Sequence, residues 1–406
     1  MQKQQCLEGV KILDFSWFLA GPMATKHLAD FGAEVIKVES LKRPDAFRYV
    51  EPFKNGSANI NSSAMFLQAN TGKYSLTLNL NHPGGLEIAK RLVRWADVVT
   101  ESFSPGTMHR LGLGYDQLRQ ENPDIIMVSS SILGNKGIYP GFGGYALMGT
   151  ALSGYIHMTG YPGGEPVTPA SVVVADVIQP LFAAISILSA LDYRLRTGKG
   201  QWIDISQIEP MVNFIAPAIL DMEVNHRSPT RMGNRHPQAV PHTAFRCQGD
   251  DAWCAIAVFA QEEWLALCRA MGDPIWARGP KFATLAARKD NEDELERLVE
   301  AWTQGVRAQD VMELLQRLGV AAGVVQTPKD LIDNDPQLRQ RRCFVRLRHP
   351  VIGECFHPSS PVRLSRTPAK MRTSPLLGEH NEYVCTKILG MSKEEYDVLC
   401  RQRVFE

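Results

Sequence analysis

The chain has 406 residues, of which 44% are hydrophobic and 21% are charged. This ordinary globular mixture is long enough for two or three domains, and it excludes disordered and collagen-like chains. Because 44 Lys and Arg face 43 Asp and Glu, the net charge of +1 provides no broad positive field. Nucleic acid and anionic membranes are therefore poor candidate partners.

The N-terminal residues MQKQQCLEGVKILDF lack the apolar core of a secretory signal, which favours a cytoplasmic location. The most apolar segment, Val177–Leu191, contains Gln179 and Pro180 and is shorter than the roughly 20 residues that cross a membrane, so we expect a buried helix. The eight cysteines form no C-x-x-C pair. We therefore expect buried, reduced thiols and no metal site.

Elements in the first half of the chain alternate between two types. Short runs rich in β-branched residues predict strands at residues 10–15, 33–39, 74–80, 97–103 and 124–130. Segments with helical spacing lie between them, at residues 22–31, 85–96 and 115–120. This alternation predicts an α/β domain with a mostly parallel sheet covered by helices on both faces.

The second half changes in composition. A long apolar helix, 177–195, ends at Gly198 and is followed by a strand at 202–205, which closes a first domain near residue 200. A helix at 210–224 and a polar, Pro-rich loop at 227–241 come next. A hairpin and three helices then predict a smaller α+β domain, at residues 244–258, 262–271, 291–305 and 308–318. A strand pair within 344–356 and a helix at 392–401 are expected to return to the first domain.

Several common catalytic and phosphate-binding motifs are missing. The chain has no G-x-x-x-x-G-K-[ST], and no G-x-G-x-x-G follows the first predicted strand, so a standard nucleotide or NAD enzyme is not expected. H-E-x-x-H and G-x-S-x-G are also absent. Their absence argues against zinc proteases and α/β-hydrolases.

Asp176 is the single charge between Glu165 and Asp192, at the start of the long apolar helix. Two interpretations stay open. A carboxylate at a helix N-terminus is stabilised by the helix dipole. A poorly hydrated carboxylate is also a nucleophile able to form a covalent acyl intermediate.

Two further features allow both a binding role and an ordinary one. The uncharged, glycine-rich segment 137–164 permits close backbone approach to a ligand or an oxyanion, or else tight helix packing. Basic residues that follow predicted strands are suited to phosphate, or else are solvated surface charges: Lys42, Arg43, Arg48, Lys73 and Arg110.

Several segments, in one order along nearly the whole chain, resemble the class III coenzyme A transferases, the family of formyl-CoA transferase and carnitine CoA-transferase. They are LDFSWFLAGP (13–22), LADFGAEVIKVE (28–39), NTGKYSLTLNL (70–80), TESFSPGTMHRLG (100–112), Tyr145–Gly154, Ala175–Asp176, TGKGQWIDIS (197–206) and LLGEHN (376–381).

The resemblance implies a Rossmann-like large domain joined to a smaller α+β domain, in a ring-shaped subunit that interlocks with a second copy. On this basis the domains are a large CoA-binding domain at 1–210, a linker at 211–227, a small domain at 228–328 and a C-terminal return at 329–406. The partner is a second copy of the chain or a homologous subunit. No permanently bound cofactor is expected, because a CoA thioester is itself the substrate.

The resemblance also assigns roles to residues. Asp176 becomes the nucleophile, which forms an aspartyl anhydride and then an aspartyl-CoA thioester. Because thioester energy is conserved, no ATP site is needed. CoA is expected along these residues: Leu19, Ala20, Leu78, Asn79, Asn81, Ser102, Phe103, Ser104, Arg110, Gly143, Gly144, Tyr145 and Ala146.

Trp17 and Phe18 stand where relatives often carry polar residues, which predicts an aromatic acyl pocket suited to a bulky apolar group. Arg235, His236 or His242 is expected to pair with a second carboxylate of the substrate. The segments FSWFLAGP and VESLKRPD are similar to subunits of CoA-transferases that act on benzylsuccinate-type acids with succinyl-CoA as donor.

Two rival functions share this resemblance. The α-methylacyl-CoA racemases of the same fold use an acid/base pair that commonly includes a His just before the position of Tyr145, where this chain has Gly143 and Gly144. A non-catalytic subunit of a heteromeric CoA-transferase is the other alternative, and the retained Asp176 weakens it.

Overall fold

A computed structural model describes residues 5–139, 141–168 and 173–406. The chain divides into two compact units. The first consists of Met1–Ile156, Pro169–Ser228 and Leu338–Glu406, and the second of His157–Thr168 and Pro229–Gln337. The first unit is therefore assembled from three stretches of sequence, with the second unit inserted between them.

The first unit is built on a six-stranded parallel sheet with the order β3-β2-β1-β4-β5-β6. The strands are β1 (Lys11–Asp14), β2 (Glu34–Glu39), β3 (Tyr74–Thr77), β4 (Val98–Glu101), β5 (Ile126–Ser131) and β6 (Trp202–Ser206). This is the strand order of a Rossmann fold, in which the order of the strands reverses between the parallel neighbours β1 and β4. All of the strands predicted for this region are confirmed, with ends one to three residues shorter at most positions.

Helices cover both faces of the sheet. Neighbouring residues of a strand face opposite sides, and apolar side chains on both sides pack against these helices. Ile12 of β1 packs in a core with Leu28 of helix α1 (Ala20–Asp30) and Ile187 of helix α7 (Val174–Thr197). Leu13 packs on the other face, with Leu92 of helix α3 (Pro83–Trp95). The predicted covering of both faces is therefore confirmed.

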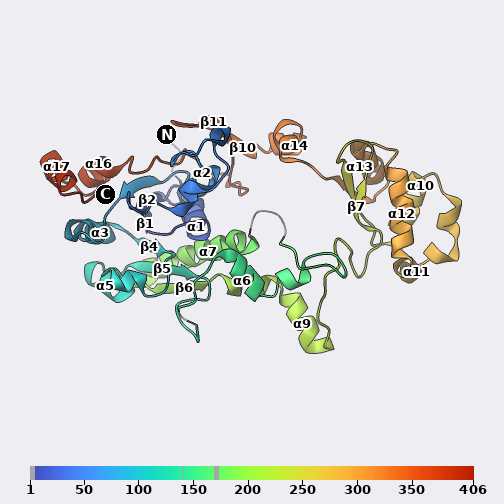
Figure 1. Ribbon diagram of the computed structural model, residues 1–406, viewed down its shortest axis with the longest axis horizontal. Coiled ribbons are helices and arrows are strands. Elements are labelled where there is room, and N and C mark those ends of the chain that lie inside the picture. The colour runs from blue at the N-terminus through green and yellow to red at the C-terminus, as the bar shows by residue number, and fades with distance from the viewer. Residues whose placement is uncertain (1–4, 140, 169–172) are drawn as a thin grey trace. The chain divides into compact units, whose positions relative to one another are not determined.

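The C-terminal segment also belongs to this unit. Val404 and Phe405 are buried in the core that contains Leu13, and the Thr77 hydroxyl donates to the Phe405 carbonyl at 2.8 Å. In Figure 1 the red helices of this segment lie beside the blue N-terminal strands. Its elements are α15 (Pro336–Gln340), the antiparallel pair β10 (Phe344–His349) and β11 (Gly353–Pro358), α16 (Asn381–Tyr383), the π-helix η6 (Val384–Ile388) and α17 (Lys393–Arg401).

Shorter helices complete the first unit. They are η1 (Ala46–Tyr49), η2 (Lys54–Gly56), α2 (Ala64–Ala69), α4 (Thr107–Arg110), α5 (Tyr115–Glu121), α6 (Ala146–Leu152), α8 (Ile208–Phe214) and α9 (Ala216–Asn225). Helices α8 and α9 occupy most of the span predicted as a linker, 211–227. Pro217, at the second position of α9, is compatible with the start of a helix.

The second unit has its own apolar core around Trp264 and Phe282. Its antiparallel sheet has the order β7-β8-β9, so the predicted hairpin gains a third strand. The elements are η3 (Ile156–Met158, at the boundary), β7 (His242–Arg246), β8 (Trp253–Ala257), α10 (Gln261–Ala270), η4 (Ile275–Arg278), η5 (Pro280–Phe282), α11 (Leu285–Asp290), α12 (Glu292–Thr303), α13 (Ala308–Arg317), β9 (Ala321–Val324) and α14 (Pro328–Asp333).

Two expectations about burial need correction. Helix α7 is not wholly buried, since Leu181 is 50% and Ile185 61% exposed on the side opposite the sheet. By length and composition it is the one helix in the described part of the chain able to span a membrane, a property that core helices share. The cysteines are all free, but Cys6 and Cys400 are exposed rather than buried.

Candidate active site

The carboxyl ends of the six parallel strands open onto one cavity of about 1240 Å³. Its lining includes the segments that follow β1, β2, β3 and β4, together with Ser130 and Ser131 at the end of β5 and Gln207 directly after β6. A crevice at the carboxyl ends, beside the point where the strand order reverses, is where open α/β sheets bind their ligands. The fold therefore places a ligand site here.

Asp176 lies on this cavity, in the first turn of α7. Its position is held by the backbone, since its N–H donates to the Val173 carbonyl at 2.9 Å. The side-chain amide of Gln207 donates to Asp176 Oδ1 at 3.0 Å. Gln207 is itself anchored through its backbone N–H, which donates to the Ser131 carbonyl at 2.9 Å. Strands β5 and β6 thus supply the hydrogen bond that orients the carboxylate.

Burial raises the pKa of Asp176 to about 6, and the hydrogen bond from Gln207 opposes this shift. At pH 7 the group is therefore mainly a carboxylate, but a poorly hydrated one. Loss of hydration disfavours the charge and makes the oxygen a better nucleophile. Of the two interpretations of Asp176, this environment favours a chemical role.

Aromatic side chains form one wall of the cavity. The rings of Trp17 and Phe103 meet edge to face at 5.6 Å, and the guanidinium of Arg43 lies over the Trp17 ring at 5.9 Å. Phe18 meets both Phe47 and Tyr145 edge to face. The predicted aromatic surface at Trp17 and Phe18 is thus extended by three rings from other segments.

Most residues expected at a CoA site line the same cavity. They are Leu19, Ala20, Leu78, Asn79, Asn81, Ser102, Phe103, Ser104, Gly143, Gly144, Tyr145 and Ala146. Ser102 also has a structural role, because its hydroxyl accepts from the Trp17 N–H at 2.9 Å. These segments are far apart in the sequence, and the sheet brings them together.

The basic candidates separate into three groups. Lys42 and Arg43 line the cavity. Arg48 and Lys73 do not: both are buried in ion pairs, with Glu39 and Asp14 respectively, which leaves neither available to a phosphate. Arg110 is exposed and lies outside the lining, where its Nη2 donates to Thr107 Oγ1 at 2.8 Å.

Arg235, His236 and His242 belong to the second unit. The Arg235 guanidinium donates to Glu296 at 2.6 Å and also binds Asp293, so its charge is already balanced. His236 and His242 pack around Phe259, with ring distances of 5.2 and 5.8 Å. Of these three side chains, those of His236 and His242 form no ion pair with a carboxylate among the described residues.

Sequence reasoning missed a number of residues that line the site, among them Val173, Gln207, Phe47 and Ser131. Gln207 carried a usable signal, because it lies two residues after the predicted strand at 202–205, at the sheet edge where polar ligands bind. Phe47 carried none, since it lies in a segment for which no element was predicted. Its place in the wall depends on the path of the chain after β2.

Comparison with known proteins agrees with this geometry. Residues 7–381 match the model of CoA-transferase family III. A succinyl-CoA–D-citramalate CoA-transferase of Chloroflexus aurantiacus is 34% identical over 400 residues, which cover 98% of each chain. A succinyl-CoA:glutarate CoA-transferase of Mus musculus is 31% identical, over 98% of this chain and 90% of that protein.

A solved structure of similar fold is a CaiB/BaiF family protein from Brucella suis. It superposes with a TM-score of 0.87 and is 33% identical, and the match covers 95% of this chain and all of that one. The agreement therefore extends over both compact units and the C-terminal segment. The chain belongs to CoA-transferase family III and is a CoA-transferase, an enzyme that moves coenzyme A from an acyl-CoA to a carboxylic acid.

Proposed function

We propose that Asp176 carries the CoA group through a covalent double displacement. Its carboxylate attacks the acyl-CoA carbonyl, and the C–S bond breaks to give a mixed anhydride and CoA thiolate. The thiolate then attacks the aspartyl carbonyl, which releases the donor acid and leaves an aspartyl-CoA thioester. Each step exchanges one acyl bond for another, so no co-reactant is consumed.

The second half reverses these steps with the acceptor. The acceptor carboxylate attacks the aspartyl thioester and again releases the thiolate. The thiolate then attacks the acceptor carbonyl of the new anhydride, which yields the new acyl-CoA and restores the Asp176 carboxylate. The Gln207 amide, 3.0 Å from Oδ1, holds the carboxylate in place between attacks.

The observation that carries this proposal is a poorly hydrated carboxylate on the wall of a large cavity, which among the described residues receives one side-chain hydrogen bond, from Gln207. Asp176→Asn keeps the size of the side chain and removes the nucleophile. We expect turnover to fall by several orders of magnitude, since covalent catalysis is lost. Steady-state transfer from succinyl-CoA to a panel of carboxylic acids measures this loss.

A matched control is Asp192→Asn, which changes an exposed Asp on the same helix. This variant should transfer CoA at the rate of the wild type. Hydroxylamine should also modify Asp176 when acyl-CoA is present and leave it unmodified without acyl-CoA. Transfer by Asp176→Asn at more than a few per cent of the wild-type rate would contradict the nucleophile assignment.

CoA is proposed to occupy the cavity along the lining residues named above, with Lys42 and Arg43 facing its phosphates. The exposed glycines Gly143 and Gly144 have no side chain, so the ligand can approach the protein backbone closely there. Arg110 remains a proposed phosphate contact from outside the lining, because Thr107, its hydrogen-bond partner, lies on the cavity.

Succinyl-CoA is the proposed donor, because the citramalate and glutarate enzymes that this chain resembles are named for it. A dicarboxylic or aromatic acid is the proposed acceptor, in keeping with the aromatic wall. In the second unit, His236 or His242 is proposed to bind a carboxylate of the substrate in preference to Arg235, whose charge Glu296 already balances.

The racemase alternative receives less support. Proton removal and return at the α-carbon need an acid/base pair. Among the described residues that line the cavity there is no histidine. His157 lies in the second unit. The two functions are separated by incubation with an α-methylacyl-CoA and a labelled carboxylic acid. Epimerisation of the acyl-CoA with no label entering the CoA ester would favour the racemase instead.

The active form is proposed to be an interlocked dimer in the cytoplasm. Large apolar side chains are exposed on three consecutive helices, among them Ile185 of α7, Phe214 of α8 and Leu220 of α9, which supports the proposal that a partner covers this part of the chain. A homologous second subunit is the other form, since a similar protein is named as the β subunit of a succinyl-CoA–L-malate CoA-transferase. Sedimentation should show twice the 45.2 kDa chain mass at nanomolar concentration, whereas a folded monomer would contradict interlocking.

A further inference from the structure

Phe18 has an unusual backbone conformation. Its φ of +63° lies in the left-handed region, which a bulky side chain rarely adopts. Such a conformation persists only where the surroundings impose it, and it is concentrated at functional sites. Phe18 lies on the cavity, between the end of β1 and the start of α1. The contacts that hold it there therefore bear on the shape of the site.

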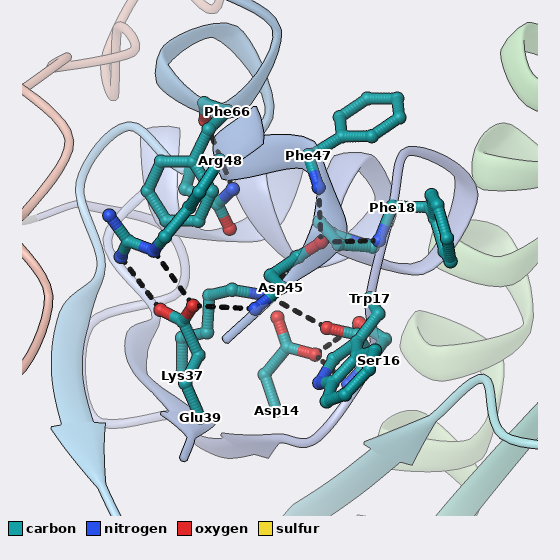
Figure 2. A network of polar contacts seen from close by, with 12 residues as sticks. Asp14, Ser16, Trp17, Phe18, Lys37, Glu39, Asp45, Phe47, Arg48 and Phe66 are labelled. Carbon is teal, nitrogen blue, oxygen red and sulfur yellow. Dashed lines mark hydrogen bonds and ion pairs between the residues drawn. The ribbon is translucent and has the colours of Figure 1, made fainter. Parts of the chain in front are cut away.

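One buried carboxylate holds two cavity residues. Asp45 Oδ1 accepts hydrogen bonds from the N–H of Phe18 and from the N–H of Phe47, each at 3.0 Å. Figure 2 shows both amides directed at this carboxylate. Asp45 is fully buried, and its own N–H donates to Glu39 Oε1 at 3.1 Å. The single oxygen thus sets the spacing between the β1–α1 loop and η1.

Lys37 fixes the carboxylate in turn. Its ammonium pairs with Asp45 Oδ2 at 2.9 Å and donates to the Ser16 carbonyl at 2.8 Å. Burial lowers the pKa of Lys37, but the carboxylates of Asp45, Glu39 and Asp14 outweigh it and raise the pKa overall. The charge on Lys37 therefore holds both Asp45 and the residue two positions before Phe18.

The two clamped residues belong to one row of rings. Phe18 meets Phe47 at 5.7 Å and Tyr145 at 5.5 Å, both edge to face. Tyr145 is the N-cap residue of α6, and the first residue of that helix, Ala146, packs in a small core with Ala175, the neighbour of Asp176. The row thus runs from η1 to the segment that holds the nucleophile.

We infer that Asp45 is a positioning residue for acyl specificity: it locks Phe18 and Phe47 into an aromatic wall, with Tyr145, that binds bulky apolar acyl groups. The inference rests on the proposed function for the identity of the ligand, an acyl-CoA. A small acyl group gains little from the wall, because it offers little surface for the rings to cover. Discrimination between large and small acyl groups is then the property that Asp45 controls.

The test compares the dissociation constants of benzoyl-CoA and acetyl-CoA, measured calorimetrically in an Asp176→Asn background so that no acyl group is transferred. Asp45→Asn presents an NH₂ group either to Lys37 or to the two amides, and so breaks one half of the clamp. We expect the preference for benzoyl-CoA over acetyl-CoA to fall about 10-fold, the range for a changed apolar pocket contact. Both ligands carry the same CoA, so a smaller fraction of folded protein affects both dissociation constants equally and leaves their ratio unchanged.

Phe47→Leu keeps Asp45 and removes one ring, so it should shift the ratio in the same direction even if Asp45→Asn does not fold. Asp310→Asn, an exposed residue paired with Arg307 in the second unit, is the matched control and should leave the ratio unchanged. An unchanged ratio in a folded Asp45→Asn or Phe47→Leu variant overturns the inference. The proposed function is tested separately with the wild-type chain, which carries Asp176: a shifted ratio together with a wild-type chain that transfers no CoA would keep the wall and remove the proposed function.

Discussion

Asp14 and Asp176 are two carboxylates on the same sheet scaffold, and their surroundings are opposite. Asp14, the last residue of β1, is fully buried and accepts five hydrogen bonds, from Ser16 (twice), Thr25, Lys73 and Thr100. Within the described part of the chain, Asp176 has one side-chain donor, Gln207. Burial raises the pKa of both carboxyls, but at Asp14 the lysines and hydrogen bonds outweigh it and lower the pKa overall.

The difference teaches how one fold can hold a structural carboxylate and, under the proposed function, a chemical one. A carboxylate with all of its lone pairs occupied is stable and unreactive, and it ties β1 to the loops that line the cavity. A carboxylate with one donor keeps an oxygen available for attack at a cost in stability. Donor count therefore distinguishes the two roles better than burial does.

Removing the structural carboxylate should have the largest effect on stability. Asp14→Ala leaves Lys73 buried without its partner, so we expect a loss of about 3–5 kcal/mol in the free energy of unfolding at pH 7. Since folding lowers the pKa of Asp14, its contribution is present above about pH 4 and is lost as the pH falls further. Urea unfolding at pH 7 measures the loss.

A double variant, Asp14→Leu with Lys73→Met, sharpens this prediction. It removes both charges and should cost less than Asp14→Ala alone, because no unpaired charge remains. If Asp14→Ala is as stable as the wild type at pH 7, the structural role of this carboxylate is wrong.

Removing the Asp176 carboxylate should raise the free energy of unfolding, whereas removing that of Asp14 should lower it. Folding raises the pKa of Asp176 from 3.8 to about 6. Ionisation of this carboxyl therefore destabilises the fold fully above pH 6 and has no effect on its stability below pH 4. Asp176→Asn should therefore be more stable than the wild type at pH 8, by up to about 3 kcal/mol at 1.36 kcal/mol per pKa unit. Thermal unfolding at pH 4 and pH 8 measures this, and equal stability of the two proteins at both pH values would contradict it.

Changing the donor count at Asp176 should have the smallest effect. Gln207→Leu removes the hydrogen bond that opposes the raised pKa, so the acid limb of kcat/KM should move up by about 1 pH unit, equivalent to about 1.4 kcal/mol. A pH profile from 5 to 9 measures the shift. At pH 9, where Asp176 is ionised in both proteins, the variant should recover most of its relative loss. A uniform loss at every pH would show that Gln207 acts by some other route.

Particular elements show how far sequence reasoning reached. The strands at 33–39 and 124–130 were predictable because continuous β-branched runs are typical of a sheet buried on both faces. The exposed side of α7 was not, because the segment is apolar around its whole circumference and periodicity alone gives no exposed face. The helix predicted at 210–224 is present as two helices, α8 and α9, which meet at Ile215, although the same span was also assigned as a linker.

The amino-acid sequence by itself determined the family and the α/β layers, because ordered motifs and local periodicity are written in neighbouring residues, and it singled out Asp176 as the proposed nucleophile. Only the tertiary structure decided which side chains share the cavity. Gln207 reaches Asp176, and Asp45 joins Phe18 to Phe47, through parallel strands whose carboxyl ends meet although their residues are far apart in the chain. The tertiary structure also decided that Arg48 and Lys73 are buried in ion pairs, because burial and pairing depend on packing that no local pattern encodes.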